Sequence, residues 1–301
     1  MSTMKNLTIP QDASRLPVTL SRMAEKRRLG EPLVMVTAYD HPSALAADRA
    51  GVDLVLVGDS GAMTVLGYDS TVPVTLDELL VLARAVRRGI STPFMVGDLP
   101  FGSYEVSDEQ AVTTAMRFVK EAGCDAVKLE GGGETSVARA RAIVNAGIPV
   151  MGHVGLTPQT STALGGYKAQ GRTAAAAARV RDEALALQRA GCFSIVFEAI
   201  PAEVSAAIMP EMDALIIGIG AGPSTDGQVL VFHDLLGIRD GRGARFVQRY
   251  ADLLDEMVAG VGAFAADVRS RHYPAPDHDY TIPEEELAAF KAGLPPSDAG
   301  S

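Results

Sequence analysis

The stretch EAGCDAVKLEGG, residues 121–132, contains the pattern from which the architecture follows. A helix-like segment ends at Gly123, and an apolar run follows that finishes in charged residues. Glycine ends helices readily because it adopts positive φ without a Cβ clash. The run is apolar at both even and odd positions, which is typical of a strand buried on both faces. The stretch therefore predicts a helix followed by a buried strand of a parallel sheet.

The same pattern recurs along the chain. A glycine precedes the runs VDLVLVGDS (52–60), ISTPFMVGD (90–98), IPVMGH (148–153) and CFSIVFEAI (192–200), and further strand-like runs are LVMVTAYD (33–40), ALIIGIGAG (214–222) and GQVLVFHD (227–234). About eight strands alternating with helical segments predict a single α/β domain, a (β/α)8 TIM barrel. A doubly wound open sheet is the alternative. It is disfavoured because the glycine-rich GIGAG, the nearest approach to a dinucleotide fingerprint, opens no helix.

Further signals place the helices and loops. Capping motifs at Thr75–Glu78 and Ser107–Gln110, and a capping residue at Thr173, predict three helix starts. The segment VTLSRMAEKRR predicts an N-terminal helix that covers the bottom of the barrel. Two long connections, 60–75 and 155–172, follow strand ends, so we expect them on the catalytic face.

The expected organisation is a flexible N-terminus (1–16), a catalytic barrel (17–275) and a partly disordered C-terminal tail (276–301). Hydrophobic residues make up 47% and charged residues 21%, which excludes a disordered chain. A net charge of −10 argues against a nucleic-acid partner. No apolar run approaches the ~20 residues of a membrane helix, and the N-terminus lacks a secretory signal. With only Cys124 and Cys192, both expected to be buried, we predict a cytoplasmic protein.

Ionisable residues mark the ends of five successive predicted strands. They are Asp59 with Ser60, Asp98, Lys128 with Glu130, His153 and Glu198. A barrel gathers the carboxyl ends of its strands around one pocket. Unpaired buried charges are costly, so a repeated placement of this kind predicts an active site rather than a core.

Three of these residues, Asp59, Asp98 and Glu130, carry hard oxygen donors. Converging carboxylates repel one another unless a cation lies between them. Without a cysteine cluster for a softer metal, Mg²⁺ is the expected ion. The alternative for any single aspartate is a helix N-cap or a loop hydrogen bond.

The other three ionisable residues leave more than one role open. Lys128 could hold an anionic substrate, or only neutralise the acids as an internal ion pair. His153 could be a ligand, an acid, a hydrogen-bond donor or a structural residue. Glu198, in the apolar setting IVFEAIP, could be a general base, a fourth acid of the metal site or a partner of a metal ligand.

Several long motifs resemble those of the ketopantoate hydroxymethyltransferase family. They are VGDS with the following residues to Thr75, GDLPFGSY (97–104), KLEGG (128–132), GHVGLTPQ (152–159), GGYKAQGR (165–172) and GIGAG through VFHD (218–234). The resemblance runs from about residue 16 to about residue 273. It departs from the family at Gly133, in IRDGRGARFVQRY, and in the tail from Pro276.

The resemblance implies a barrel of the phosphoenolpyruvate/pyruvate type. It implies that a one-carbon unit passes from 5,10-methylenetetrahydrofolate to 3-methyl-2-oxobutanoate through a Mg²⁺-stabilised enolate, giving 2-dehydropantoate for pantothenate synthesis. By motif, Asp59, Asp98 and Glu130 fall on the metal site, with one ion per subunit. The keto-acid contacts fall on Asp59, Ser60, Asp98, Lys128 and His153, and the general base on Glu198. The family also implies a homo-oligomer, often a decamer.

Two other functions fit the ionisable strand-end residues in part. A Mg²⁺-dependent 2-oxo acid lyase or aldolase of the same barrel superfamily would use a similar enolate. The isocitrate-lyase type carries a reactive cysteine in a KKCGH-like loop, which this sequence lacks. A barrel that only binds a metabolite is a further alternative, and the intact set of ionisable residues argues against it.

Overall fold

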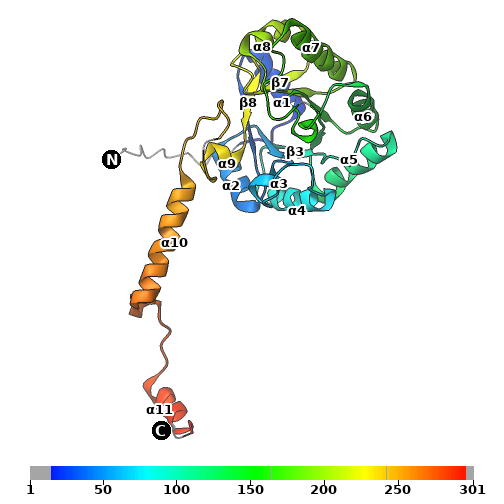
Figure 1. The fold of residues 1–301 in the computed structure, drawn as a ribbon. Helices are drawn as coiled ribbons and strands as arrows, with labels where there is room; N and C mark the ends of the chain where they lie inside the picture. Colours follow the sequence, from blue (N-terminus) through cyan, green and yellow to red (C-terminus); the bar gives the residue numbers. More distant parts are fainter. Residues whose placement is uncertain (1–14, 164, 242, 296–301) are drawn as a thin grey trace. The chain divides into compact units, whose positions relative to one another are not determined.

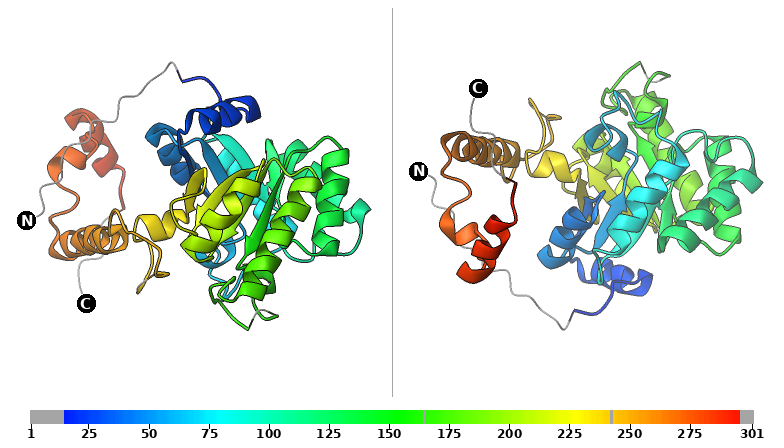
Figure 2. Two further views of the ribbon diagram at one scale, coloured as in Figure 1. Left: turned by 90° about the horizontal axis from the view of Figure 1, so that it is seen from above. Right: turned by 90° about the horizontal axis from the view of Figure 1, so that it is seen from below.

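The computed structural model describes residues 15–163, 165–241 and 243–295. Eight parallel strands form a closed barrel in the order β1 to β8, ringed by helices (Figures 1 and 2). The strands are β1 (Leu33–Thr37), β2 (Leu54–Val57), β3 (Phe94–Asp98), β4 (Ala126–Lys128), β5 (Val150–Gly155), β6 (Ser194–Glu198), β7 (Leu215–Ile219) and β8 (Gly227–Leu230). The predicted barrel is confirmed. Each strand lies within a run that the sequence pattern marked, except that β5 extends two residues beyond the run 148–153.

Helices follow most of the strands. They are α1 (Leu20–Leu29), α2 (His41–Ala50), α3 (Gly61–Thr64), α4 (Leu76–Arg87), α5 (Asp108–Ala122), α6 (Glu134–Asn145), α7 (Ala174–Arg189), α8 (Ala202–Ile208), α9 (Phe232–Leu235), α10 (Leu253–Ser270) and α11 (Glu284–Ala292), with 3-10 turns η1 (Pro158–Thr160), η2 (Met209–Glu211) and η3 (Pro276–His278). The connection from β7 to β8, residues 220–226, is fully described and contains no helix. The barrel therefore departs from strict β/α alternation at this point.

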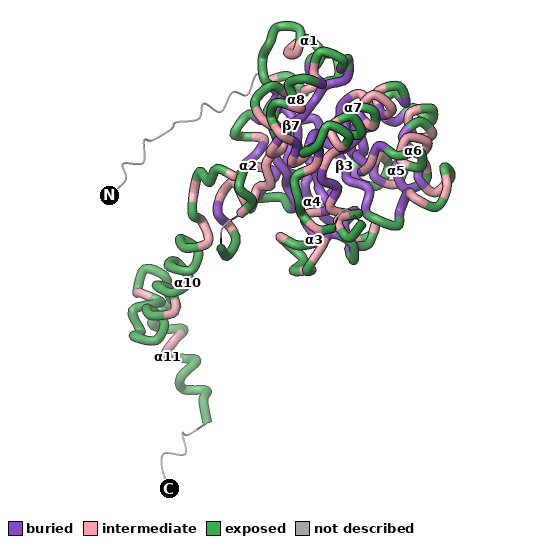
Figure 3. The backbone as a smooth tube through the Cα atoms, turned by 45° about the horizontal axis from the view of Figure 1, so that its top comes forward, coloured by how far each residue is buried: buried purple, intermediate pink, exposed green. Residues whose placement is uncertain are grey.

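The chain divides into two compact units, one through Ala251 and one from Asp252. Sequence reasoning instead expects the barrel to run to residue 275. Helix α10 belongs to the second unit and buries no side chain within the chain (Figure 3). The expected flexible N-terminus lies almost wholly outside the described residues, as does the end of the tail. Among the described helices, none is both long and apolar enough to cross a membrane.

Local capping chemistry explains where the helices begin. The Thr75 side chain accepts a hydrogen bond from the Glu78 backbone, and the Glu78 carboxylate accepts one from the Thr75 backbone in return, as predicted. Thr173 caps α7 as predicted. The second predicted capping box forms only in half. Ser107 caps α5, but the Gln110 side chain accepts from the Val106 backbone instead of the Ser107 backbone.

Two apolar clusters pack against the strands, one on each face of the sheet. One cluster fills the space between the barrel and the outer helices, and the other fills the barrel interior. Alternate residues of a strand face the same side. On β3, Phe94 and Val96 belong to the interior cluster, so Asp98 continues the same face above them. The same two-residue spacing carries the interior face from Met151 to His153 on β5. The ionisable residues therefore form a polar layer on top of an apolar floor.

Helix α1 closes the opposite end of the barrel. Its Met23 side chain is fully buried in the interior cluster, beside the first residues of several strands. Lys26 pairs with Asp53 at 2.7 Å, directly before β2, and Arg27 pairs with Asp226 at 3.2 Å, directly before β8. The predicted cover of the barrel bottom is confirmed.

Gly155 is a sensitive point of the barrel because β5 and β6 approach closely there. Its φ is +98°, and a Cβ atom would lie 2.2 Å from the Glu198 carbonyl oxygen. We expect Gly155→Ala to lower the free energy of unfolding by about 2–5 kcal/mol, since positive φ and overpacking both cost energy. Chemical unfolding measures this loss.

The matched control is Gly30→Ala at the end of α1. Gly30 also has positive φ, but a Cβ atom added there would meet no other atom within 4 Å. Only the backbone cost of about 1 kcal/mol is expected there. Equal losses for the two variants would show that close strand contact is unimportant at Gly155.

Candidate active site

A cavity of about 960 Å³ opens at the carboxyl ends of the strands. Asp59 and Ser60 line one side of it, and Glu198 lines another. The long loop after β5 contributes Tyr167 and Lys168 among others. The segment after β8 adds further lining residues, namely Asp234, Ile238, Arg239, Asp240, Ala244, Arg245 and Phe246. Polar groups thus lie deep in the cavity, with aromatic and basic side chains nearer its rim.

A buried ionic cluster lies beside this cavity. Asp98, Lys128, Glu130 and His153 are each at most 4% exposed. The Lys128 ammonium donates to both carboxylate oxygens of Asp98, at 2.8 and 2.9 Å, and lies 3.6 Å from Glu130 Oε1. Neighbouring strands make these contacts because Asp98 and Lys128 are paired in the register of β3 and β4. Asp59 joins the cluster through its backbone N–H, which donates to Asp98 at 3.1 Å.

The His153 ring lies between two carboxylates. Its Nδ1 is 3.4 Å from Glu130 Oε1, and its Nε2 is 3.2 Å from Glu198 Oε2. Neither nitrogen makes a well-aligned hydrogen bond. Glu198 is 16% exposed, so the histidine connects the buried Glu130 to a carboxylate that faces the cavity.

Burial and charge shift the pKa values of the cluster in different directions. Burial, with Asp98 and Glu130 nearby, raises the pKa of Asp59 well above its usual range. Burial also raises the pKa of Asp98, although Lys128 opposes this. For Glu130, Lys128 and His153 outweigh the effect of burial, and the pKa is lowered. The three acids keep the pKa of Lys128 raised despite its burial.

The pKa of His153 is raised to about 9. Burial and the nearby Lys128 lower it, but the facing carboxylates of Glu130 and Glu198 outweigh both effects. The folded protein therefore favours the imidazolium form of His153 at neutral pH. A positive ring between two carboxylates offsets part of the negative charge of the cluster.

The acid cluster suits Mg²⁺ in its usual mode of binding. Asp59, Asp98 and Glu130 are buried together, and their carboxyl groups offer the hard oxygen donors that Mg²⁺ prefers. Within the described chain, no three His, Cys, Asp or Glu side chains are arranged to hold an ion by themselves. Proteins commonly bind Mg²⁺ through one or two carboxylates, with waters and substrate oxygens completing the shell. Asp59 and Asp98 fit that mode.

Glu130 is engaged differently from the other two acids. Its Oε2 accepts from the Gln159 backbone N–H at 3.0 Å, while its Oε1 faces Lys128 and His153. The structure thus brings the three predicted acids into one cluster without aiming all of them at one point. The assignment of Glu130 as a direct ligand stays a prediction.

Sequence reasoning missed several residues of the site. The Tyr39 hydroxyl and the Ser60 hydroxyl share a hydrogen bond of 2.8 Å, and burial raises the pKa of Tyr39 to about 12. Tyr104 and Gln159 are buried against the acids. The sequence signal that could have found Tyr104 and Gln159 was their position inside the motifs GDLPFGSY and GHVGLTPQ. Neutral polar side chains in loops do not stand out as charged strand ends do.

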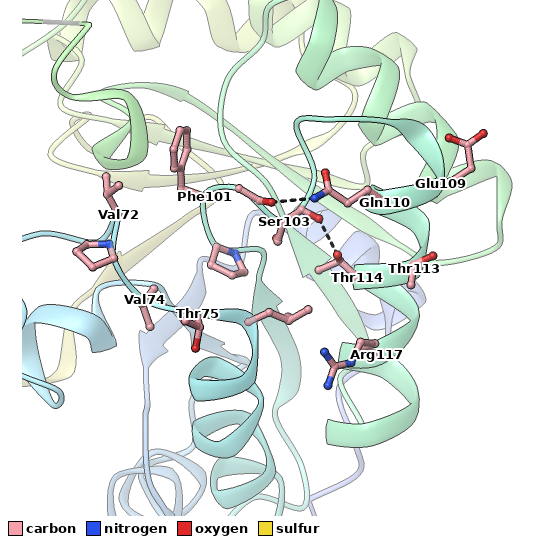
Figure 4. A pocket seen from close by; sticks show the side chains of 14 residues that line it. Val72, Val74, Thr75, Phe101, Ser103, Glu109, Gln110, Thr113, Thr114 and Arg117 are labelled. Atoms are coloured by element: carbon pink, nitrogen blue, oxygen red, sulfur yellow. Dashed lines mark hydrogen bonds between the residues drawn. The ribbon is translucent and has the colours of Figure 1, made fainter.

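A second cavity, of about 680 Å³, lies between the start of α4 and the outer side of α5 (Figure 4). Its one basic lining residue, Arg117, already pairs with Asp77 and Glu121. The buried ionic cluster contributes no side chain to this cavity. The chemistry therefore belongs to the cavity at the strand ends.

Comparisons with known proteins agree with this geometry. The family model described as ketopantoate hydroxymethyltransferase matches residues 17–276. A 3-methyl-2-oxobutanoate hydroxymethyltransferase from Moorella thermoacetica is 50% identical over 268 residues, covering 89% of this chain and 99% of that protein. A mitochondrial 3-methyl-2-oxobutanoate hydroxymethyltransferase from Arabidopsis thaliana is 49% identical over 283 residues, covering 92% of this chain and 82% of that protein.

Solved structures resemble the fold at low sequence identity. A phosphonopyruvate hydrolase in complex with oxalate and Mg²⁺ aligns with a TM-score of 0.57 at 12% identity, covering 92% of this chain and 99% of that one. A 2,3-dimethylmalate lyase, a PEP mutase/isocitrate lyase superfamily member, aligns with a TM-score of 0.57 at 15% identity, covering 95% and 99%. At such identities the likeness shows the fold alone.

The raised pKa of His153 predicts a pH dependence of stability. The folded state holds the proton up to about pH 9, while the unfolded state releases it near 6.5. The contribution of the His153 proton to stability is therefore complete below pH 6.5 and is lost as the pH rises through 9. Over this pH window, in EDTA, we expect the free energy of unfolding of the wild-type protein to fall by about 1–3 kcal/mol more than that of His153→Gln. Chemical unfolding at a series of pH values measures the difference.

The surface variant His41→Gln is the control, because His41 is exposed and lies away from the cluster. It should retain the wild-type pH profile. A wild-type profile in His153→Gln as well would mean that the ring does not carry the proton in the folded protein.

Proposed function

The chain belongs to the ketopantoate hydroxymethyltransferase family, and we propose that it transfers a hydroxymethyl unit from 5,10-methylenetetrahydrofolate to 3-methyl-2-oxobutanoate, with Mg²⁺. The product is 2-dehydropantoate, a precursor of pantothenate. As a member of this family the chain is a transferase. The observation that carries the finer proposal is the placement of Glu198, which ends β6 and lines the same cavity as Asp59 and Ser60 after β2, four strands away in the closed barrel.

Asp59 and Asp98 are the residues that would hold Mg²⁺. When bound, the ion would supply a Lewis acid that stabilises negative charge on the carboxylate and keto oxygens of a 2-oxo acid. Their hard oxygen donors support this choice of metal. The phosphonopyruvate hydrolase of similar fold was solved with Mg²⁺ and oxalate, which adds an argument by analogy of fold.

The residues of the site have different roles in the proposed reaction. Glu198 removes the proton from C3 of the keto acid, and the electron pair becomes an enolate. Water replaces the folate nitrogens on the methylene carbon, so the two C–N bonds break, the water protons pass to the nitrogens, and tetrahydrofolate leaves. The C3 carbon then forms a bond to the released one-carbon unit, whose oxygen takes up the proton that Glu198 removed. Ser60, with its hydroxyl held by Tyr39, would bind the substrate carboxylate. Lys128 offsets negative charge from within the cluster.

His153 would support Glu198 in this scheme. Its Nε2 lies 3.2 Å from the Glu198 carboxylate, within the distance of an ion pair with the base. Direct contacts of Asp98, Lys128 and His153 with the keto acid stay predictions, since Asp59, Ser60 and Glu198 are the members of the set that line the cavity. Exposed basic side chains at the rim, Lys168 and Arg245, suit the carboxylates of a folate.

Two broader expectations accompany this function. We propose a homo-oligomer, a decamer by family resemblance, and the exposed apolar side chains Val258, Val261 and Phe264 of α10 support self-association. The cytoplasmic location also stays a prediction, and one similar plant enzyme is named as mitochondrial. The 2-oxo acid lyase considered from the sequence is disfavoured, because the family match makes the chain a transferase and the lyase of similar fold is only 15% identical.

Exchange of the C3 proton tests the role of Glu198. In D₂O with Mg²⁺ and no folate, wild-type protein should exchange the C3 proton of 3-methyl-2-oxobutanoate, as followed by NMR. We expect Glu198→Gln to bind the keto acid but to slow exchange by about 10²–10⁴-fold, the usual contribution of a general base. Glu203→Gln makes the same chemical change at an exposed position of α8 and should exchange normally. Undiminished exchange in Glu198→Gln would remove Glu198 as the base.

A product assay tests the whole reaction. Purified protein with 3-methyl-2-oxobutanoate, methylenetetrahydrofolate and Mg²⁺ should form 2-dehydropantoate, detected by mass spectrometry, and EDTA should abolish it. Exchange without product would retain the enolate chemistry but reject folate as the donor. That result would favour the lyase alternative.

A further inference from the structure

Gln159 joins the acid cluster from the loop after β5. It lies in the turn η1 and is 4% exposed. Its side-chain Nε2 donates to Asp59 Oδ2 at 3.0 Å and to the Leu99 carbonyl at 2.9 Å. Its Oε1 accepts from the Tyr104 hydroxyl at 2.7 Å. One amide thus contacts the ends of β2 and β3 and the loop that follows β3.

The orientation of this amide is fixed by its partners. The Leu99 carbonyl can only accept, so the amide nitrogen must face it. Tyr104 then donates to the amide oxygen, because the phenol oxygen already accepts from the Glu130 backbone N–H at 3.3 Å. Gln159 is therefore a donor toward Asp59 and cannot turn over to become an acceptor without opposing the Leu99 carbonyl.

The network closes on Glu130. The Gln159 backbone N–H donates to Glu130 Oε2 at 3.0 Å, while the Glu130 backbone is held by Tyr104. Both the side chain and the backbone of Gln159 thus donate to buried carboxylates. Hydrogen bonds to charged acceptors are stronger than neutral ones and fix geometry inside a low-dielectric interior.

We propose that Gln159 is a positioning residue of the metal site, which holds the Asp59 carboxylate in the orientation for Mg²⁺ and couples it to Glu130 through Tyr104. This inference rests on the proposed function, because it assumes that Asp59 binds the ion. Donors that hold a ligating carboxylate commonly change metal affinity by about 10–100-fold when removed. Gln159 itself does not touch the reacting atoms in this scheme.

Metal binding by metal-free protein tests the proposal, with isothermal titration calorimetry of Mg²⁺. Gln159→Met keeps the side-chain length but removes both donors and the acceptor. We expect it to weaken Mg²⁺ binding by about 10–100-fold and to raise the Mg²⁺ concentration for half-maximal turnover by the same factor. Excess Mg²⁺ should then restore most of kcat, a response that a merely structural defect would not give.

Thr114→Val is the matched control. Thr114 is buried, and its hydroxyl donates to the Ser103 carbonyl at 2.6 Å, next to Tyr104 but outside the acid cluster (Figure 4). It should lower Tm through the lost hydrogen bond and leave Mg²⁺ affinity unchanged. If Gln159→Met does not fold, Gln159→Asn keeps the amide but shortens its reach, and should also weaken Mg²⁺ binding.

The outcomes separate this proposal from the proposed function. Wild-type Mg²⁺ affinity in a folded Gln159→Met or Gln159→Asn variant would overturn the role of Gln159 alone. An equal loss of affinity in Thr114→Val would also overturn it, since the effect would then follow stability. Wild-type protein that binds no Mg²⁺ and forms no product would overturn the proposed function, and this inference with it.

Discussion

The Lys128 ammonium, enclosed by Asp98 and Glu130, is the interaction on which the site depends. Several carboxylates lie in a barrel interior that excludes water, and one fixed cation holds two of them together. A charge buried without a partner would destabilise the barrel. Because Asp98 ends β3 and Lys128 ends β4, their ion pair also fixes the relative positions of these two strand ends.

Much of the barrel follows from local sequence signals. Glycines at Gly51 and Gly123 end helices in the left-handed conformation, and the apolar runs after them become strands. The two-residue strand period also places Asp98 and His153 on the interior face, above an apolar floor. The two-residue period does not show how deeply each strand-end side chain is buried. Whether a strand-end residue faces the cavity or lies beneath it depends on the loops that cover the rim.

The residues that sequence reasoning missed share a physical reason. Gln159 meets Asp59 across 100 positions of the chain, and Tyr104 meets Gln159 across 55. Neither side chain is charged, and neither ends a strand, so no local pattern marks it.

Closure of the barrel bottom by α1 determines from which side a ligand can reach the site. With Met23 and the interior cluster filling the lower half, the barrel is a cup with a single mouth. A ligand that reaches Asp59 must therefore enter and leave at the strand ends, past the residues that the loop after β5 and the segment after β8 place along the cavity.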